Sequence, residues 1–191
     1  QLGYNPQQIA DSVAKESAKS IEYFTRSLSI FPALPSDGYN QLGKAYFNRG
    51  NLDSALTYYM RAYKEDSTNG IFINNIGTVY YNRGMALLSQ QKPQEAVPLL
   101  MQSFPYFRRA HDRDTTESDF MNNIGCVYGT LNQPDSAIYW FEKALAKDSL
   151  DLTSVSFLSM TWKTKGDSAK AFYYQQKADA VRRIKTEQIR Q

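Results

Sequence analysis

The chain has 191 residues and a formal net charge of +3, and its 42% hydrophobic residues, with 14 Tyr and 10 Phe, predict a folded protein. Its single Cys126 and single His111 exclude an intramolecular disulfide, a multi-cysteine zinc site and any metal site built on paired histidines. The charge excess lies entirely in residues 177–191 and no apolar run approaches the roughly 20 residues that span a bilayer, so we expect neither a nucleic-acid partner nor membrane insertion.

Residues 5–34 predict one long helix at the N-terminal end of the fold. Asn5 suits the N-cap position, and Pro6 suits the first helical position, where a backbone N–H is not needed. We expect the apolar face of this helix to cover the exposed end of the helices that follow. The residues on that face recur at helical spacing and are Ile9, Val13, Ile21, Phe24, Leu28 and Phe31.

A short pattern recurs along the rest of the chain: an aliphatic residue and a small one, followed three residues later by an aromatic side chain. In the first copy, Ala55, Tyr59 and Ala62 follow at helical spacing. Small residues on one helix let a second helix approach closely, so each copy predicts a pair of packed helices. The four copies, whose aromatic residues are 34, 48 and 34 positions apart, are Leu42-Gly43 with Tyr46, Ile76-Gly77 with Tyr80, Ile124-Gly125 with Tyr128, and Leu158-Ser159 with Trp162.

A turn signal containing glycine, asparagine or proline separates the two helices of each pair. Three of these turns run into the tripeptide Asp-Ser-Ala, which begins at Asp53, Asp135 and Asp167. Aspartate favours the start of a helix because it caps free amides and meets the positive end of the helix dipole. The last tripeptide comes two residues early relative to its aromatic residue, which predicts a tighter turn in the final pair.

The second unit is longer than the others by 14 residues. Helical periodicity continues past Gly84 and breaks only at residues 91–93. Dividing the insertion into about seven residues on each helix predicts a long hairpin over residues 85–110, which projects roughly 10 Å beyond its neighbours. Pro98 and Pro105 predict bends in its second helix. The projection is either a specific contact surface or a tolerated insertion.

The first unit resembles the tetratricopeptide repeat family, whose 34-residue helix pairs carry leucine-glycine, tyrosine, glycine, alanine, aromatic and alanine at fixed positions. The matching residues are Leu42, Gly43, Tyr46, Gly50, Ala55, Tyr59 and Ala62. The resemblance covers residues 36–180 and implies one all-α domain, a right-handed solenoid of helix pairs with one elongated hairpin. Its expected parts are the cap at 5–34, the repeats at 36–69, 70–117 and 118–151, and a last repeat at 152–191 that ends in a capping helix containing Val181 and Ile184.

The resemblance also implies that the first helix of each pair lines a concave face. Asparagines stand beside the aliphatic-glycine pairs on this face, and an amide offers the donor and the acceptor that an extended peptide backbone requires. We expect Asn75 and Asn123 to be the main backbone contacts, whereas the alternative is that the asparagines brace the helices. The candidate peptide-binding residues are Asn40, Gln41, Lys44, Phe47, Asn74, Asn75, Thr78, Tyr81, Asn122 and Asn123.

No enzyme signature is evident, and no glycine-rich phosphate loop predicts a cofactor. His111 lies among charged residues, and Cys126 lies where a small side chain packs. The sequence therefore favours a non-catalytic scaffold that binds a protein or an extended peptide. Because the chain begins with Gln1 rather than Met, the alternative is the soluble repeat region of a larger protein, for instance a membrane-bound glycosyltransferase, that recruits its polypeptide substrate. A third interpretation is self-association through an uncapped end or through the long hairpin. We expect a soluble protein, of either the cytoplasm or the periplasm.

Overall fold

The computed structural model describes residues 5–31 and 33–190, and all regular structure within these ranges is helical. Pro32, inside the predicted cap at 5–34, and Gln191, at the end of the last predicted repeat, lie outside the described residues. None of the described helices is both long and apolar enough to cross a membrane. The helices are α1 Pro6–Ile30, α2 Ser36–Asn48, α3 Leu52–Glu65, α4 Gly70–Ser89, α5 Pro93–Arg113, α6 Ser118–Thr130, α7 Pro134–Lys147, α8 Leu152–Thr164 and α9 Ser168–Arg190.

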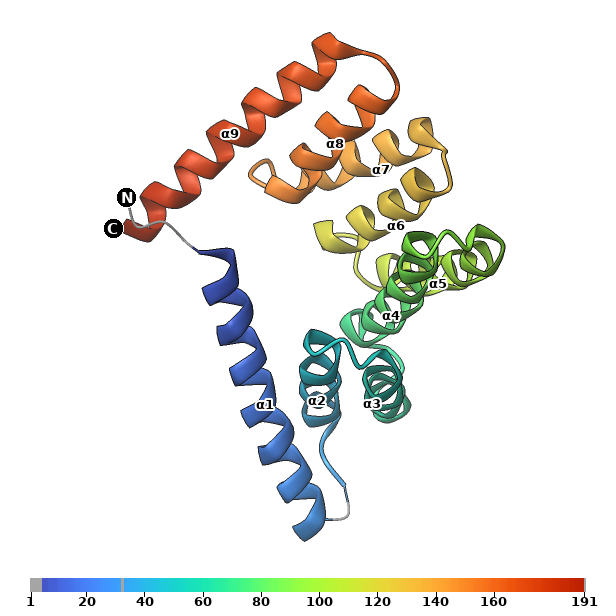
Figure 1. Cartoon of the computed structure of the whole chain (residues 1–191), viewed down its shortest axis with the longest axis vertical. Coiled ribbons are helices and arrows are strands. Elements are labelled where there is room, and N and C mark those ends of the chain that lie inside the picture. Colours follow the sequence, from blue (N-terminus) through green and yellow to red (C-terminus); the bar gives the residue numbers. More distant parts are fainter. Residues whose placement is uncertain (1–4, 32, 191) are drawn as a thin grey trace.

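The helices α2 to α9 form consecutive pairs that stack along an arc (Figure 1). The first helices of successive pairs also contact each other, α4 with α6 and α6 with α8. These first helices therefore form the inner side of the arc. The long helices α1 and α9 extend from its two ends and flank the open side (Figure 1).

A glycine on the first helix lies directly against an aromatic ring on the second helix in the first and third pairs. A Cβ atom added at Gly43 would lie 2.6 Å from the Tyr59 ring, and one at Gly125 would lie 2.6 Å from the Phe141 ring. Both distances are far below van der Waals contact, so only glycine permits this approach of the two helices. The recurring aliphatic-glycine pair in the sequence is explained by this packing.

The elongated second pair repeats the same packing twice. A Cβ atom at Gly77 would lie 2.8 Å from the Phe107 ring, and one at Gly84, two helical turns later, would lie 2.8 Å from Leu100. Helices α4 and α5 have 20 and 21 residues, compared with 13 and 14 in α2 and α3. The predicted elongated hairpin is therefore confirmed, with seven extra residues on each helix.

The turns inside the four pairs have one backbone form. Each has three residues, and the central residue has a positive φ angle: 73° at Gly50, 60° at Gln91, 57° at Asn132 and 88° at Gly166. A left-handed residue at this place ends the first helix and reverses the chain. The final turn is the same length as the others, so the prediction of a tighter turn was wrong.

The Asp-Ser-Ala tripeptide that begins at Asp167 led to the wrong prediction of turn length, because it occupies a different position in its unit from the other two tripeptides. Asp167 is the last residue of the turn, and its side-chain oxygen caps α9 by accepting a hydrogen bond of 3.0 Å from the Lys170 amide. The small residues buried against α8 are Ala171 and Ala178. Ser159, which replaces the packing glycine, donates a hydrogen bond of 2.9 Å to the Ala171 carbonyl.

The aspartates that begin the other tripeptides do not cap their helices. In α3 the cap is Asn51, whose side-chain oxygen accepts a hydrogen bond of 3.0 Å from the Ser54 amide. Asp53 lies in the first turn and pairs with Arg83 of the next unit at 2.5 Å. Its acidic side chain still meets the positive end of the helix dipole.

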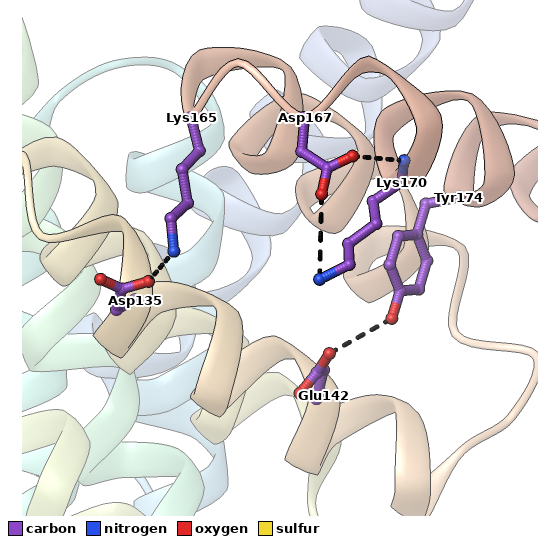
Figure 2. Close-up of polar contacts among 6 residues, drawn as sticks. All are labelled: Asp135, Glu142, Lys165, Asp167, Lys170 and Tyr174. Atoms are coloured by element: carbon purple, nitrogen blue, oxygen red, sulfur yellow. Dashed lines mark hydrogen bonds and ion pairs between the residues drawn. The ribbon is translucent and has the colours of Figure 1, made fainter.

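Polar contacts also attach the last pair to the third (Figure 2). Asp135, in the first turn of α7, pairs with Lys165 at the end of α8. Tyr174 of α9 donates a hydrogen bond of 3.3 Å to Glu142 of α7. These contacts attach the turn after α8, and α9 itself, to α7.

The two terminal helices cover less of the stack than expected. Asn5 caps α1 as predicted, accepting a hydrogen bond of 2.9 Å from the Gln7 amide. However, Phe31 is exposed, and so is Val13, which lines a cavity beside α2. Because α1 has 25 residues and α2 only 13, part of α1 has no helix beside it, and Ile9 is exposed. In α9, Val181 is buried but Ile184 is exposed for the same reason.

Candidate functional site

Two hydrogen bonds between asparagine side chains join the first helices of the arc. Asn75 of α4 donates a bond of 2.8 Å from Nδ2 to Oδ1 of Asn40 on α2. Asn123 of α6 donates a bond of the same length to Oδ1 of Asn74 on α4. The asparagines therefore brace adjacent units, as the alternative interpretation of the sequence allowed.

Asn122 belongs to a buried network rather than to the surface of the arc. Its amide donates a hydrogen bond of 2.6 Å to Asp151, and its oxygen lies 2.9 Å from the Ser154 hydroxyl, whose single proton it shares with the Asp151 carboxylate. Asn122 is 2% exposed and Asn40 is 8% exposed. Direct contact between a ligand and either side chain would require movement of the helices.

Asn75 and Asn123 are half-buried and keep hydrogen-bonding capacity beyond the bonds between helices. Each uses one of its two N–H groups, and within the described part of the chain the oxygen of each accepts no bond. The bond to the neighbouring helix fixes the plane of each amide. Both groups therefore present an oriented acceptor and a donor on the inner side of the arc.

Other candidate residues take different places. Gln41 and Lys44 are exposed and line a cavity of about 250 Å³ between α1 and α2. Phe47 packs against the core formed by α3 and α4. The Thr78 hydroxyl donates a hydrogen bond to the carbonyl of Asn74 in its own helix, so its proton is already used.

Tyr81 lines an apolar pocket of about 330 Å³ on the inner side, between α4, α6 and α8. Its hydroxyl shares a hydrogen bond of 3.0 Å with Thr130, which leaves the ring as a wall of the pocket. Met85, Phe157 and Met160 form much of the remaining lining. We call this hollow the inner pocket.

Met85 and Met160 of the inner pocket are not among the candidate peptide-binding residues predicted from the sequence. Met160 is 58% exposed and Met85 is also exposed, and both line the inner pocket. The signal was present in the pattern, because Met160 directly follows the Leu158-Ser159 pair on a first helix. Methionine adapts its shape to a ligand, and it is over-used at binding surfaces.

The two residues considered for catalysis have structural surroundings. Cys126 of α6 lines the inner pocket and packs against a core formed by α7, α8 and α9, and burial raises the pKa of its thiol to about 12. His111 is buried, and burial, together with nearby Lys143, lowers the pKa of its imidazole. Among the described residues, no group of three metal-binding side chains comes together.

Comparisons with known proteins agree with this architecture. Sequence profiles of the tetratricopeptide repeat match residues 36–69 and 75–148. No curated protein matches the sequence.

Three solved structures show the fold. A MamA crystal structure is 20% identical with a TM-score of 0.62, covering 87% of this chain and 89% of its own. MamA from residue 41 onward, from Desulfovibrio magneticus RS-1, is 16% identical with a TM-score of 0.67, covering 93% of each chain. YrrB, described as a TPR protein with an unusual peptide-binding site, is 18% identical with a TM-score of 0.58, covering 91% of this chain and 81% of its own.

Proposed function

Because this chain belongs to the tetratricopeptide repeat family, we propose that it is a non-catalytic scaffold that binds an extended segment of another protein along the inner side of its arc. The observation that carries the proposal is the inner pocket, an apolar hollow on the surface that the first helices form. A pocket of about 330 Å³ accommodates one or two apolar side chains of a partner. The peptide-binding site named for YrrB, which has a similar fold, gives the proposal support by analogy.

In this proposal the inner pocket contributes to the affinity for the partner by burying one of its apolar side chains. Met85 and Met160 would close around an apolar side chain, and the rings of Tyr81 and Phe157 would form the walls. Burying an apolar side chain there is worth about 1.5 to 3 kcal/mol, before the cost of ordering the partner. Binding that depends on one such anchor is modest in strength.

Asn75 and Asn123 would hold the backbone of the bound segment. Their amide planes are fixed by the bonds to Asn40 and Asn74, so little side-chain entropy is lost on binding. An extended backbone offers alternating donors and acceptors, which match the free oxygen and N–H of each amide. These contacts would recognise main chain and tolerate varied sequences.

The test is retention of proteins from the source cells on immobilised chain and on a Met160→Glu variant. A carboxylate at the mouth of the inner pocket disfavours an apolar anchor, and position 160 is exposed enough to accept it without loss of stability. Met101→Glu is the matched control, since Met101 is 54% exposed on α5 and does not line the pocket.

We expect wild type and Met101→Glu to retain the same proteins and Met160→Glu to lose them. An Asn75→Ala, Asn123→Ala double variant should weaken retention without abolishing it. Equal retention by wild type and Met160→Glu would exclude the inner pocket as the site.

A further inference from the structure

A second cavity, of about 660 Å³, lies between the second helices α5 and α7. Most of its lining comes from Arg108, His111 and Asp112 on α5 and from Tyr139, Trp140 and Lys143 on α7. The inner pocket, by contrast, is lined mainly by the first helices α4, α6 and α8. We call the second hollow the outer cavity.

Two cations in the outer cavity are held over aromatic rings and not by acids. The Arg108 guanidinium lies 5.3 Å from the centre of the Trp140 ring. The Lys143 ammonium lies 5.0 Å from the centres of both the Tyr139 and Trp140 rings. Neither cation forms an ion pair with another described residue. Both are therefore available to an anionic partner.

Trp140 is fixed at the base of this arrangement. The His111 ring packs edge-on against it at 5.3 Å, with an angle of 87° between the ring planes. The Nδ1 atom of His111 is buried and has no hydrogen-bond partner among the described residues. Burial lowers the pKa of His111, and Lys143 and Arg108 lower it further against the opposing effect of Asp112.

The two acids that line the cavity, Asp112 and Asp135, form no ion pair with its cations. Asp135 pairs with Lys165 at the end of α8. Asp112, which follows His111 on α5, forms no ion pair with another described residue and lies outside bonding reach of Arg108 and Lys143. Arg108 and Lys143 can each pair with a carboxylate, and the Trp140 ring can pack against an apolar side chain next to that carboxylate.

We propose that the outer cavity is a second binding site, which takes an acidic peptide segment. Its carboxylate side chains pair with Arg108 and Lys143, and an adjacent apolar side chain packs on Trp140 and Tyr139. A peptide fits better than a nucleic acid, because two cations in one shallow hollow cannot track a phosphate backbone and the chain outside residues 177–191 carries balanced charge. The site does not depend on the inner pocket.

Fluorescence of Trp140 reports on this site directly. The chain has two tryptophans, so a Trp162→Phe background leaves Trp140 as the sole tryptophan signal. The buried indole N–H of Trp162 has no partner among the described residues, so phenylalanine suits that position. The probe is an acetylated and amidated peptide with the sequence Glu-Glu-Phe-Glu-Glu-Phe, compared with a peptide in which glutamine replaces each glutamate.

We expect a saturable change in Trp140 fluorescence with the glutamate peptide and an affinity about tenfold lower or worse for the glutamine peptide. An Arg108→Gln, Lys143→Gln double variant should lose affinity by a similar factor. Arg61→Gln is the matched control, because Arg61 is on α3, outside the cavity, and lies over the rings of Tyr39 and Tyr58. This variant should bind the glutamate peptide as wild type does.

Three outcomes would overturn the proposal. One is equal binding of the glutamate and glutamine peptides, and another is full binding by the Arg108→Gln, Lys143→Gln variant. The third is loss of peptide binding in Met160→Glu, which would place the peptide in the inner pocket. Circular dichroism of each variant separates a lost site from a lost fold.

Discussion

Gly125 of α6 lies so close to the Phe141 ring of α7 that a Cβ atom would come within 2.6 Å of it. The contact recurs between Gly43 and Tyr59 in the first pair. The aromatic ring fills the space that the missing side chain leaves, and the two residues together set the distance between the helices. The stability of the first three units therefore depends on a glycine, which makes no side-chain contact of its own.

Replacing Gly125 by alanine should destabilise the protein by about 1 to 3 kcal/mol, because Phe141 is buried and cannot move aside. Gly129→Ala on the same helix is the control. A Cβ atom there meets only Ala137 at 3.8 Å, and alanine favours a helix over glycine, so the expected effect is neutral or stabilising by up to about 1 kcal/mol. Urea unfolding of both variants measures the difference, and equal effects would contradict this packing.

Gln91→Gly should stabilise the long hairpin. Gln91 has a φ of 60°, a left-handed conformation that costs a residue with a side chain about 1 kcal/mol. Glycine removes that cost but adds entropy to the unfolded chain, which leaves a gain of about 0.5 kcal/mol. Gln90, with a φ of −86°, has no such strain, so Gln90→Gly should destabilise. The midpoint of thermal unfolding should rise for the first variant and fall for the second.

Asn122→Ala should cost about 2 kcal/mol, because it removes a buried donor from the Asp151 carboxylate. Asn123→Ala breaks a bond between neutral groups and should cost about 0.5 to 1 kcal/mol. Comparing the two variants by urea unfolding at neutral pH separates the buried network from the surface brace. Equal losses would mean that the network around Asp151 is unimportant.

The cost of Asn122→Ala should depend on pH. Burial raises the pKa of Asp151, but hydrogen bonds from Ser154 and Asn122 outweigh it and leave the pKa below 3.8. A lowered pKa gives stability that is present above about pH 4 and is lost as the pH falls through the folded-state value. The difference in unfolding free energy between wild type and Asn122→Ala should therefore narrow below pH 4, and a constant difference would contradict the linkage.

Cys126 should react slowly with thiol reagents in the folded protein. Burial raises the pKa of its thiol from 9.0 to about 12, so at pH 8 the reactive thiolate is roughly a thousandfold rarer than in the unfolded chain. Labelling with an aromatic disulfide reagent, with and without guanidinium, measures the ratio. Fast labelling of the folded chain would show that the wall of the inner pocket at Cys126 opens readily.

The repeat and the elongated hairpin were predictable because close helix packing requires particular residues at fixed positions in the sequence. Glycine must face an aromatic or leucine side chain on the partner helix, so an insertion is tolerated only when it preserves that register. The second pair satisfies this condition with Gly84 and Leu100. The final turn was misjudged because Asp167 resembles Asp53 by its neighbours, although it occupies the place of Asn51 in the turn.

The candidate site was less predictable, because it depends on how side chains from separate units meet. The sequence placed the asparagines on the first helices but could not show that they bond to one another across units. It also did not bring Tyr81 of α4 together with Met160 of α8. These contacts join residues far apart in the chain, and nothing in the local periodicity specifies them.

The central claim, that a partner segment lies on the inner side of the arc, can be tested by methyl NMR of the five methionines. A peptide is first selected from a random library on the Arg108→Gln, Lys143→Gln variant, which closes the outer cavity to acidic peptides. On adding that peptide, the methyl signals of Met85 and Met160 should shift, and those of Met60 and Met101, exposed on the second helices, should stay in place. Shifts at Met60 and Met101 with no change at Met85 and Met160 would contradict the account.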